Sequence, residues 1–226
     1  MTLGRVGIIV AARMSSSRLP GKALLPLYGL PMVVFLLRRL RGARMGDVIL
    51  ATTTLAADDR LTDTVVAERV PVFRGADADV VARYVGAAKQ FGFDTVARVT
   101  ADCPFVDAEL ADWCIARTVE FEHFDLATTK GEFPVGLDLE VYRADCMAAL
   151  DASGQLTAAD REHLTLHFYN HPDTFAVRHI APPPRWTHTE RRFTVDTVAD
   201  YDDAKALTEK MGRAEFPISA MLNAIQ

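Results

Sequence analysis

The sequence predicts an α/β fold, a doubly wound and mostly parallel sheet with helices on both faces. Short apolar runs rich in β-branched residues alternate with longer amphipathic segments through the first half of the chain, which is typical of this class. The first run, Val6–Ala12, is apolar throughout, as expected of a parallel strand that is covered on both sides. The chain has 226 residues, of which 50% are hydrophobic, enough for the core of one domain.

The same alternation continues as far as residue 128. Pro31 suits the first turn of a helix and precedes the apolar run Met32–Leu40. Asp107 is a suitable N-cap for a later helix, because its carboxylate can accept hydrogen bonds from backbone N–H groups of the first turn. The expected strands are Asp47–Thr52, Val70–Phe73, Thr95–Thr100 and Asp125–Thr128, and the expected helices are Asp58–Arg69, Asp79–Phe91 and Asp107–Phe121.

The second half of the chain is less regular. Proline residues at Pro182–Pro184 interrupt any regular element there. The sequence has no internal repeat, low-complexity tract or long linker, so we expect a single domain over residues 1–226. The expected strands are Leu137–Tyr142, Phe175–Ile180 and Arg192–Val195, and the expected helices are Arg143–Ala152, Ala158–Tyr169 and Val198–Lys210.

Composition excludes several classes of protein. The chain has 25 Lys and Arg against 30 Asp and Glu, a formal charge of −5, whereas general nucleic-acid binders are usually basic. Three cysteines, Cys103, Cys114 and Cys146, lack the CxxC spacing of a zinc site and do not suggest a disulfide framework. The N-terminal apolar run stops at Arg13, too early for a membrane span or signal peptide. We expect a cytoplasmic protein without a nucleic-acid or membrane partner.

The loop after the first strand has the composition of a polyphosphate site. It contains Arg13, Arg18 and Lys22, three consecutive serines and Gly21, and it follows the carboxyl end of a strand, where open α/β sheets bind ligands. It is not a Walker P-loop. Ser16 stands in place of the first glycine of that motif, and Ala23 stands where the motif has the Ser or Thr that binds Mg²⁺. A solvated basic turn is the competing interpretation.

Two aspartates occur at the ends of predicted strands. Asp102 follows Thr95–Thr100, and Asp196 follows Arg192–Val195. Carboxylate oxygens at one edge of a parallel sheet would suit Mg²⁺, with Mn²⁺ as a substitute. The competing interpretations are a turn aspartate for Asp102 and a helix N-cap for Asp196.

Other polar residues admit more than one role. His163, His167 and His171 have the spacing of one helical face, but Pro172 ends that helix, so packing is favoured over zinc binding. Arg161 and Glu162 could form an exposed pair or belong to an acceptor pocket.

Several segments taken together resemble the cytidylyltransferase family. The similarity runs in order from Val6 to about Tyr201, and the first block and TADCP are its most specific parts. The nearest branch is the spore-coat polysaccharide biosynthesis protein F type, and more distant relatives activate 3-deoxy-manno-octulosonate and acylneuraminates. The matching segments are AARMSSSRLPGKALLPLYGLPM, ATTTLAADD, VFRGADADVVARY, ARVTADCPFVD, PVGLDLEV, REHLT and RRFTVDT.

The resemblance implies a nucleotide-diphospho-sugar transferase fold and a nucleotide site. It implies that Asp102 and Asp196 bind Mg²⁺ and act in catalysis with Arg13 and Lys22. Ala11 belongs to the nucleotide-binding block, where many members of this branch have Gln. By resemblance, the CTP phosphates are held by Arg13, Ser15, Arg18 and Lys22, and the cytosine and ribose lie near Thr52, Thr53, Arg74 and Asp79.

The implied reaction is transfer of CMP from CTP to a small polar acceptor, with release of pyrophosphate, for surface polysaccharide or glycoconjugate precursors. A sugar acid is the leading acceptor, and a sugar phosphate, polyol phosphate or phosphonate stays open. Relatives are commonly dimers, and the irregular segment at residues 132–155 could serve as a dimerisation excursion, because it contains Phe133, Val135 and Leu137. The alternatives are a nucleotide-sugar-dependent glycosyltransferase and a noncatalytic nucleotide-binding module.

Overall fold

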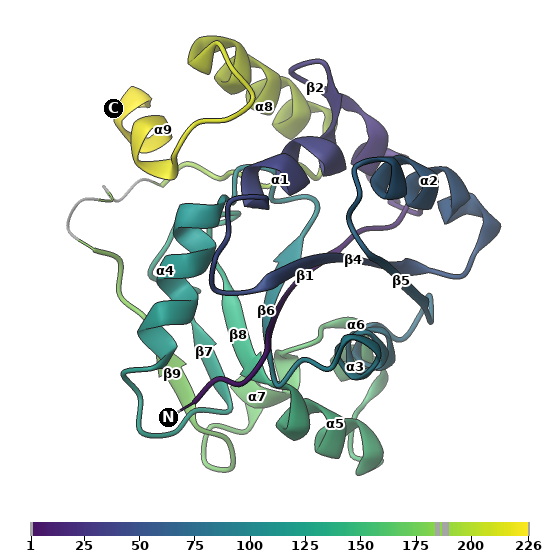
Figure 1. The fold of residues 1–226 in the computed structure, drawn as a ribbon, viewed down its shortest axis with the longest axis vertical. Coiled ribbons are helices and arrows are strands. Elements are labelled where there is room, and N and C mark those ends of the chain that lie inside the picture. The colour runs from purple at the N-terminus through teal and green to yellow at the C-terminus, as the bar shows by residue number, and fades with distance from the viewer. Residues whose placement is uncertain (1, 184–185, 187–189, 226) are drawn as a thin grey trace.

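The computed structural model describes residues 2–183, 186 and 190–225, and it contains a seven-stranded sheet with helices on both faces (Figure 1). The strand order is β5-β4-β1-β6-β8-β7-β9. The first four of these strands are parallel, and β8 runs antiparallel to both β6 and β7. The predicted α/β class and mostly parallel sheet are confirmed.

The strands of the sheet are short and their central residues are buried. In β1, Ile8 and Val10 pack on one face of the sheet and Ile9 on the other, which explains why the whole run is apolar. The bounds are β1 Val6–Ala11, β4 Asp47–Thr53, β5 Val72–Gly75, β6 Thr95–Thr100, β7 Leu126–Thr128, β8 Glu140–Arg143 and β9 Val177–His179.

Each face of the sheet has its own group of helices and its own apolar core (Figure 1). One core contains buried residues of α1 (Met32–Leu40), α2 (Asp59–Ala67), α4 (Ala108–Thr118), α8 (Val198–Met211) and α9 (Ile218–Ala224). The other contains residues of α3 (Val80–Phe91), α5 (Ala144–Ala152) and α7 (Leu166–Asn170). The short elements are α6 (Ala158–Glu162), the 3₁₀ turns η1 (Lys22–Leu24) and η2 (Ala56–Asp58), and the hairpin of β2 (Pro26–Leu27) and β3 (Leu30–Pro31).

The parallel register places three loops at one edge of the sheet. Ala11 at the end of β1 is aligned with Ala51 of β4 and with Thr100 of β6. The segments that follow β1, β4 and β6 therefore leave the sheet side by side. This is the edge at which doubly wound sheets bind ligands.

Two predicted elements are wrong in their form. Residues 192–195 form no strand. Phe193 donates its backbone N–H to the carbonyl of Val135 and Val195 donates to that of Asp102, so two different segments each supply a single bond. The predicted helix Ala158–Tyr169 is two short helices, because the backbone leaves helical geometry at His163 (φ −108°, ψ 78°).

Other elements differ in extent or were not predicted. The strand predicted to start at Leu137 starts at Glu140, and the C-terminal helix α9 was not predicted. This helix is fixed by Asp107, which accepts hydrogen bonds from the backbone N–H of Leu110 in α4 and of Ile218 in α9. Pro184, part of the predicted break Pro182–Pro184, lies outside the described residues.

Candidate active site

A cavity of about 480 Å³ lies beyond the carboxyl ends of β1 and β6. Its wall combines the loop after β1 with the first turns of α3, the segment after β6 and residues near the start of α8. Seven of the eleven predicted site residues line it, namely Ala11, Arg13, Ser15, Arg18, Lys22, Asp102 and Asp196. Residues that are up to 185 positions apart in the sequence therefore share one cavity.

Backbone contacts hold the loop after β1 in a defined shape. The carbonyl of Met14 accepts hydrogen bonds from Ser16 and Gly21, and Gly21 has a left-handed backbone (φ 71°) that suits glycine. Asp58 is 2% exposed and accepts a hydrogen bond from the backbone N–H of Met14 at 2.7 Å. Asp58 also accepts one from the hydroxyl of Thr53. These contacts argue against a mobile solvated turn.

The cations of this loop differ in their surroundings. The Arg13 side chain is 39% exposed and lies 3.4 Å from Asp77, and the Arg18 side chain is 65% exposed and lies 2.9 Å from Asp196. Lys22 is much less exposed, at 14%. Exposed guanidinium groups on the cavity wall remain available to the oxygens of an anionic ligand.

Asp102 and Asp196 converge on Lys22. The Lys22 Nζ lies 3.1 Å from Asp102 Oδ2 and 2.9 Å from Asp196 Oδ1, and it also donates to the carbonyl of Val195 at 2.9 Å. Burial raises the pKa of Asp102, but the charge of Lys22 and the hydrogen bonds from Thr100, Lys22 and Cys103 together outweigh burial, so the pKa lies below its ordinary value. Both carboxylates therefore face one point at the edge of the sheet.

The structure decides against a capping role for Asp196. The N-cap of α8 is Thr197, whose hydroxyl accepts from the backbone N–H of Asp200, while Asp200 accepts from the backbone N–H of Thr197 in a capping box. The Asp196 side chain points instead to Lys22 and Arg18. Its carboxylate is available for chemistry in the cavity.

Comparisons with known proteins agree on one family. A family model described as Cytidylyltransferase matches residues 7–219. The chain belongs to the cytidylyltransferase family. It is 32% identical over 212 residues to the spore coat polysaccharide biosynthesis protein SpsF of Bacillus subtilis, covering 90% of this chain and 86% of that protein.

Solved structures of cytidylyltransferases share the fold. One from Leptospira borgpetersenii is 28% identical, with a TM-score of 0.90, over 98% of this chain and 93% of the other. A CMP:2-keto-3-deoxy-manno-octonic acid synthetase complexed with CTP is 19% identical, with a TM-score of 0.73, over 92% of this chain and 100% of the other. The protein is a CTP-dependent nucleotidyltransferase, which disfavours the glycosyltransferase and the noncatalytic module.

The carboxylates of this cytidylyltransferase fit a hard divalent cation. Asp102 and Asp196 already share one cationic group, and each has a second carboxylate oxygen beyond the one bound to Lys22. Within residues 2–183, 186 and 190–225, no group of three or more His, Cys, Asp or Glu could hold a metal ion. Two protein carboxylates with substrate phosphates and water suit Mg²⁺, which usually keeps several waters.

Four residues predicted to lie near cytosine and ribose are not among the residues that line the cavity. Thr52 and Thr53 are fully buried. Arg74 donates to the carbonyls of Thr53 and Leu55, and Asp79 accepts from Ala82 as the N-cap of α3. Their contacts with the nucleotide stay a prediction.

Sequence reasoning gave no role to several polar residues of the cavity wall. Arg83, Tyr84 and Arg98 all line it, although each belongs to a segment quoted for the resemblance. Arg83 is 4% exposed and donates to the carbonyl of Ala76 at 2.8 Å. Alternation along β6 could have indicated Arg98, because a charged residue stands there between buried Ala97 and Val99.

The structure shows the contacts of the polar residues whose roles the sequence left undecided. Glu162 and His163 line the cavity, whereas Arg161 bridges Asp79 and Asp151 at 2.6 and 2.9 Å. The rings of His167 and His171 stack with centroids 4.0 Å apart. Because the helix breaks at His163, the three histidines do not share one face, which disfavours zinc.

The three cysteines are free, and burial raises the pKa of each thiol.

Within the described part of the chain, none of the helices combines the length and apolar character needed to cross a membrane.

Proposed function

We propose that this cytidylyltransferase transfers CMP from CTP to a sugar acid or a similar small polar acceptor and releases pyrophosphate. The observation that supports this most directly is the convergence of Asp102 and Asp196 on Lys22 in a cavity that is also lined by Arg13 and Arg18. The similarity to a spore coat polysaccharide biosynthesis protein supports a place in the synthesis of surface polysaccharide or glycoconjugate precursors. The reaction consumes CTP, and we assign it to the cytoplasm.

In this reaction an oxygen of the acceptor attacks the α-phosphorus of CTP. The new bond joins that oxygen to phosphorus, the bond to the bridging oxygen of the β-phosphate breaks, and pyrophosphate leaves with the bonding electrons. Arg13, Arg18 and Lys22 hold the phosphates in line and compensate the charge that develops on their oxygens. None of the described residues is singled out as the base that removes the acceptor proton.

A divalent ion completes the proposed site. Asp102 and Asp196 would hold Mg²⁺, or Mn²⁺ in its place, because carboxylate oxygens without thiolates favour these ions. When bound, the ion supplies additional positive charge to the phosphate oxygens.

The nucleotide preference is the first prediction. CTP should raise the melting temperature of the enzyme at concentrations in the micromolar-to-millimolar range usual for enzyme substrates, and ATP and GTP should raise it much less. Thermal-shift titrations with CTP, UTP, ATP and GTP in the presence of Mg²⁺ measure this. Equal stabilisation by all four nucleotides would contradict selective binding of CTP.

We also propose that the enzyme is a homodimer that uses part of residues 132–155. Phe133 and Leu137 are buried within the chain's own core, whereas Val135 is 44% exposed, so Val135 is the apolar candidate for the contact. Light scattering should detect a species of twice the 24.9 kDa chain mass, and Val135→Asp should shift it toward the monomer because a charge in an apolar contact is costly. A monomer at working concentration would contradict the dimer.

A further inference from the structure

The acceptor loses a proton in the reaction proposed above, and a group of the cavity wall has to take it. A hydroxyl oxygen that bonds to phosphorus must release its hydrogen, or the product keeps a positive charge on that oxygen. Ammonium and guanidinium groups are hydrogen-bond donors and cannot accept the proton. Among the described residues, those that line the cavity with such groups are Arg13, Arg18, Lys22, Arg83 and Arg98.

Most of the other polar groups on the wall are also poor proton acceptors. Asp102 and Asp196 each accept a hydrogen bond from Lys22 Nζ, and they are the proposed ligands of the divalent ion. Burial raises the pKa of Tyr84 to about 12, so its phenol keeps its proton at neutral pH. Serine and threonine hydroxyls need a base of their own before they react. Of the described residues on the wall, this leaves Glu162 and His163 as proton acceptors.

Glu162 and His163 lie at the corner between α6 and α7. Glu162 is the last residue of α6, and the chain turns at His163, where φ is −108° and ψ is 78°. Arg161 holds the end of α6 beside α3 (Figure 1), because its Nη1 lies 2.6 Å from Oδ2 of Asp79, the N-cap of α3. The first turns of α3 belong to the cavity wall, so this contact keeps the corner at the edge of the cavity.

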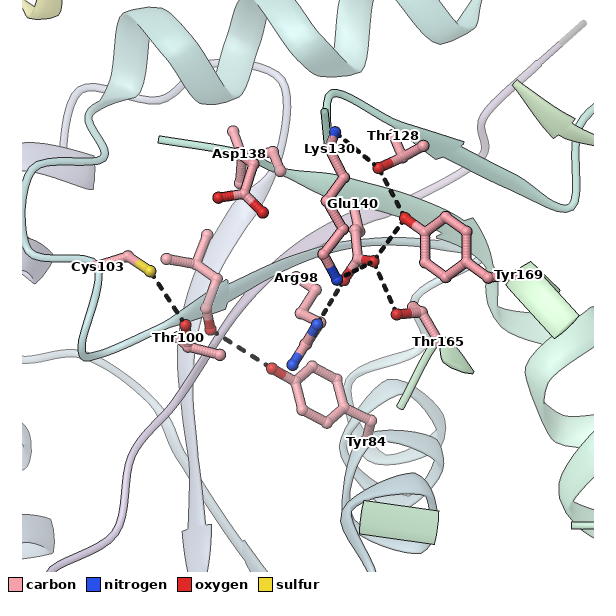
Figure 2. Close-up of polar contacts among 12 residues, drawn as sticks. Tyr84, Arg98, Thr100, Cys103, Thr128, Lys130, Asp138, Glu140, Thr165 and Tyr169 are labelled. Carbon is pink, nitrogen blue, oxygen red and sulfur yellow. Dashed lines mark hydrogen bonds and ion pairs between the residues drawn. The ribbon is translucent and has the colours of Figure 1, made fainter. Parts of the chain in front are cut away.

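A buried network fixes the chain on the other side of the corner (Figure 2). Its centre is Glu140, which is 4% exposed and accepts hydrogen bonds from the hydroxyls of Thr165 and Tyr169 at 2.7 and 2.8 Å. The second oxygen of Glu140 accepts from Arg98, which itself lines the cavity. Thr165, two residues after His163, is therefore tied to the cavity wall through one carboxylate.

The side chains of Glu162 and His163 differ from those of Arg161 and Thr165 in being free. Both are exposed, and no hydrogen bond or ion pair joins either side chain to another described residue. The backbone of the corner is thus fixed, while both side chains are open to a ligand in the cavity. An imidazole is a stronger base than a carboxylate and is still largely unprotonated at neutral pH. Of the two groups, the imidazole suits proton removal better.

We propose that His163 accepts the proton of the acceptor hydroxyl that attacks CTP. The inference rests on the proposed cytidylyl transfer. A ring nitrogen takes the proton while an electron pair of the hydroxyl oxygen forms the bond to the α-phosphorus, and pyrophosphate leaves with the electrons of the bond that breaks. Because the side chain is exposed, the imidazolium can then pass its proton to water and return to the neutral form for the next turnover.

The test replaces the imidazole and then supplies it again. His163→Gln keeps a polar side chain without the base, and its kcat should fall about 100-fold or more, the usual contribution of general acid–base catalysis. The KM for CTP should stay unchanged, because the imidazole does not hold the phosphates. In His163→Ala, imidazole added to the buffer should restore part of the turnover, since the position is open to solvent. Free imidazole would not replace a histidine that only supports the fold.

The probes include an acceptor that is always present. Pyrophosphate release is followed at saturating CTP and Mg²⁺ with 3-deoxy-manno-octulosonate, N-acetylneuraminate or glycerol 3-phosphate, and without added acceptor, where water attacks CTP. The matched control is His123→Gln, which removes an imidazole that is 62% exposed outside the cavity and should leave kcat unchanged. Glu162→Gln keeps the imidazole and should lower kcat much less than His163→Gln.

The outcomes separate the base from the reaction. A loss of kcat in His163→Gln, with partial return of turnover when imidazole is added to His163→Ala, supports the proposal. Full turnover of His163→Gln, a loss that imidazole does not restore, or a larger loss in Glu162→Gln overturns it. In each of these cases the wild-type enzyme still transfers CMP, so the proposed function stands. A wild-type enzyme that releases no pyrophosphate with any probe or with water would overturn both.

Discussion

The Asp102→Asn and Asp196→Asn enzymes are expected to fold normally and to lose turnover at least about 100-fold, since residues that only support a metal site already contribute 10- to 100-fold. Asparagine keeps an oxygen that can accept from Lys22 Nζ, so the packing around these positions is preserved. It removes the negative charge that a divalent ion requires. Pyrophosphate release from CTP, measured beside the melting temperature of each variant, tests this expectation.

The controls for this pair separate charge from structure. Asp112 accepts from the backbone N–H groups of Arg44 and Met45 far from the cavity, so Asp112→Asn should keep full turnover. High Mn²⁺ should partly restore both active-site variants, because a higher ion concentration offsets weaker binding. An active Asp196→Asn enzyme would mean that Asp196 is not a ligand of the proposed metal site. Loss of the helix cap would not explain lost activity, since Thr197 caps α8.

The parallel half of the sheet could be predicted because its strands are buried on both faces. An apolar run such as Val6–Ala11 has few alternatives when helices cover both sides of it. The same local patterns set the starts of α3 and α4, where Asp79 and Asp107 accept from the backbone three residues later. These signals lie within a few residues of the element they determine.

The errors come from contacts between distant segments. The segment at residues 192–195 is not a strand, because its backbone N–H groups bond to two separate segments, at Val135 and at Asp102, and the local pattern does not contain these contacts. Gly136 permits this approach, because a Cβ there would lie 2.6 Å from the backbone of Phe193. The apolar residues of α9 are too few to predict a helix by themselves, and tertiary contacts through Asp107 fix its start.

The residues of the candidate site were also predicted only in part. The loop cations and Asp102 were predictable from their place after strands, and Asp196 was predicted after a strand that the structure does not contain, yet the structure brings all of them together in one cavity. Arg98 and Glu140 were not assigned, because they face each other only when β6 pairs with β8. The contact of Asp58 with the backbone of Met14 was not predicted for the same reason, since it joins residues 44 positions apart in the sequence.

Replacement of Lys22 by Met is expected to reduce turnover by the equivalent of about 2–4 kcal/mol, as found for the loss of one donor that stabilises developing charge. Methionine preserves the length of the side chain but not the ammonium group. Arg13→Met should have a smaller effect, because Arg13 is 39% exposed and its charge is screened by solvent. Rates of pyrophosphate release at saturating and limiting CTP measure both variants. Lys89→Met, on the exposed side of α3, is the matched control.

The melting temperature of Lys22→Met distinguishes a chemical role from a structural one. Without the ammonium group, Asp102 and Asp196 face each other, and among the described residues Arg18 is the cation that still contacts the pair. Two ionised carboxylates repel. We therefore expect a lower melting temperature than in the wild type and a larger increase on adding Mg²⁺, because the ion relieves the repulsion that Lys22 otherwise relieves. Wild-type turnover would mean that Lys22 only holds the loop in place. An unchanged response to Mg²⁺ would mean that the two aspartates do not form a common cation site.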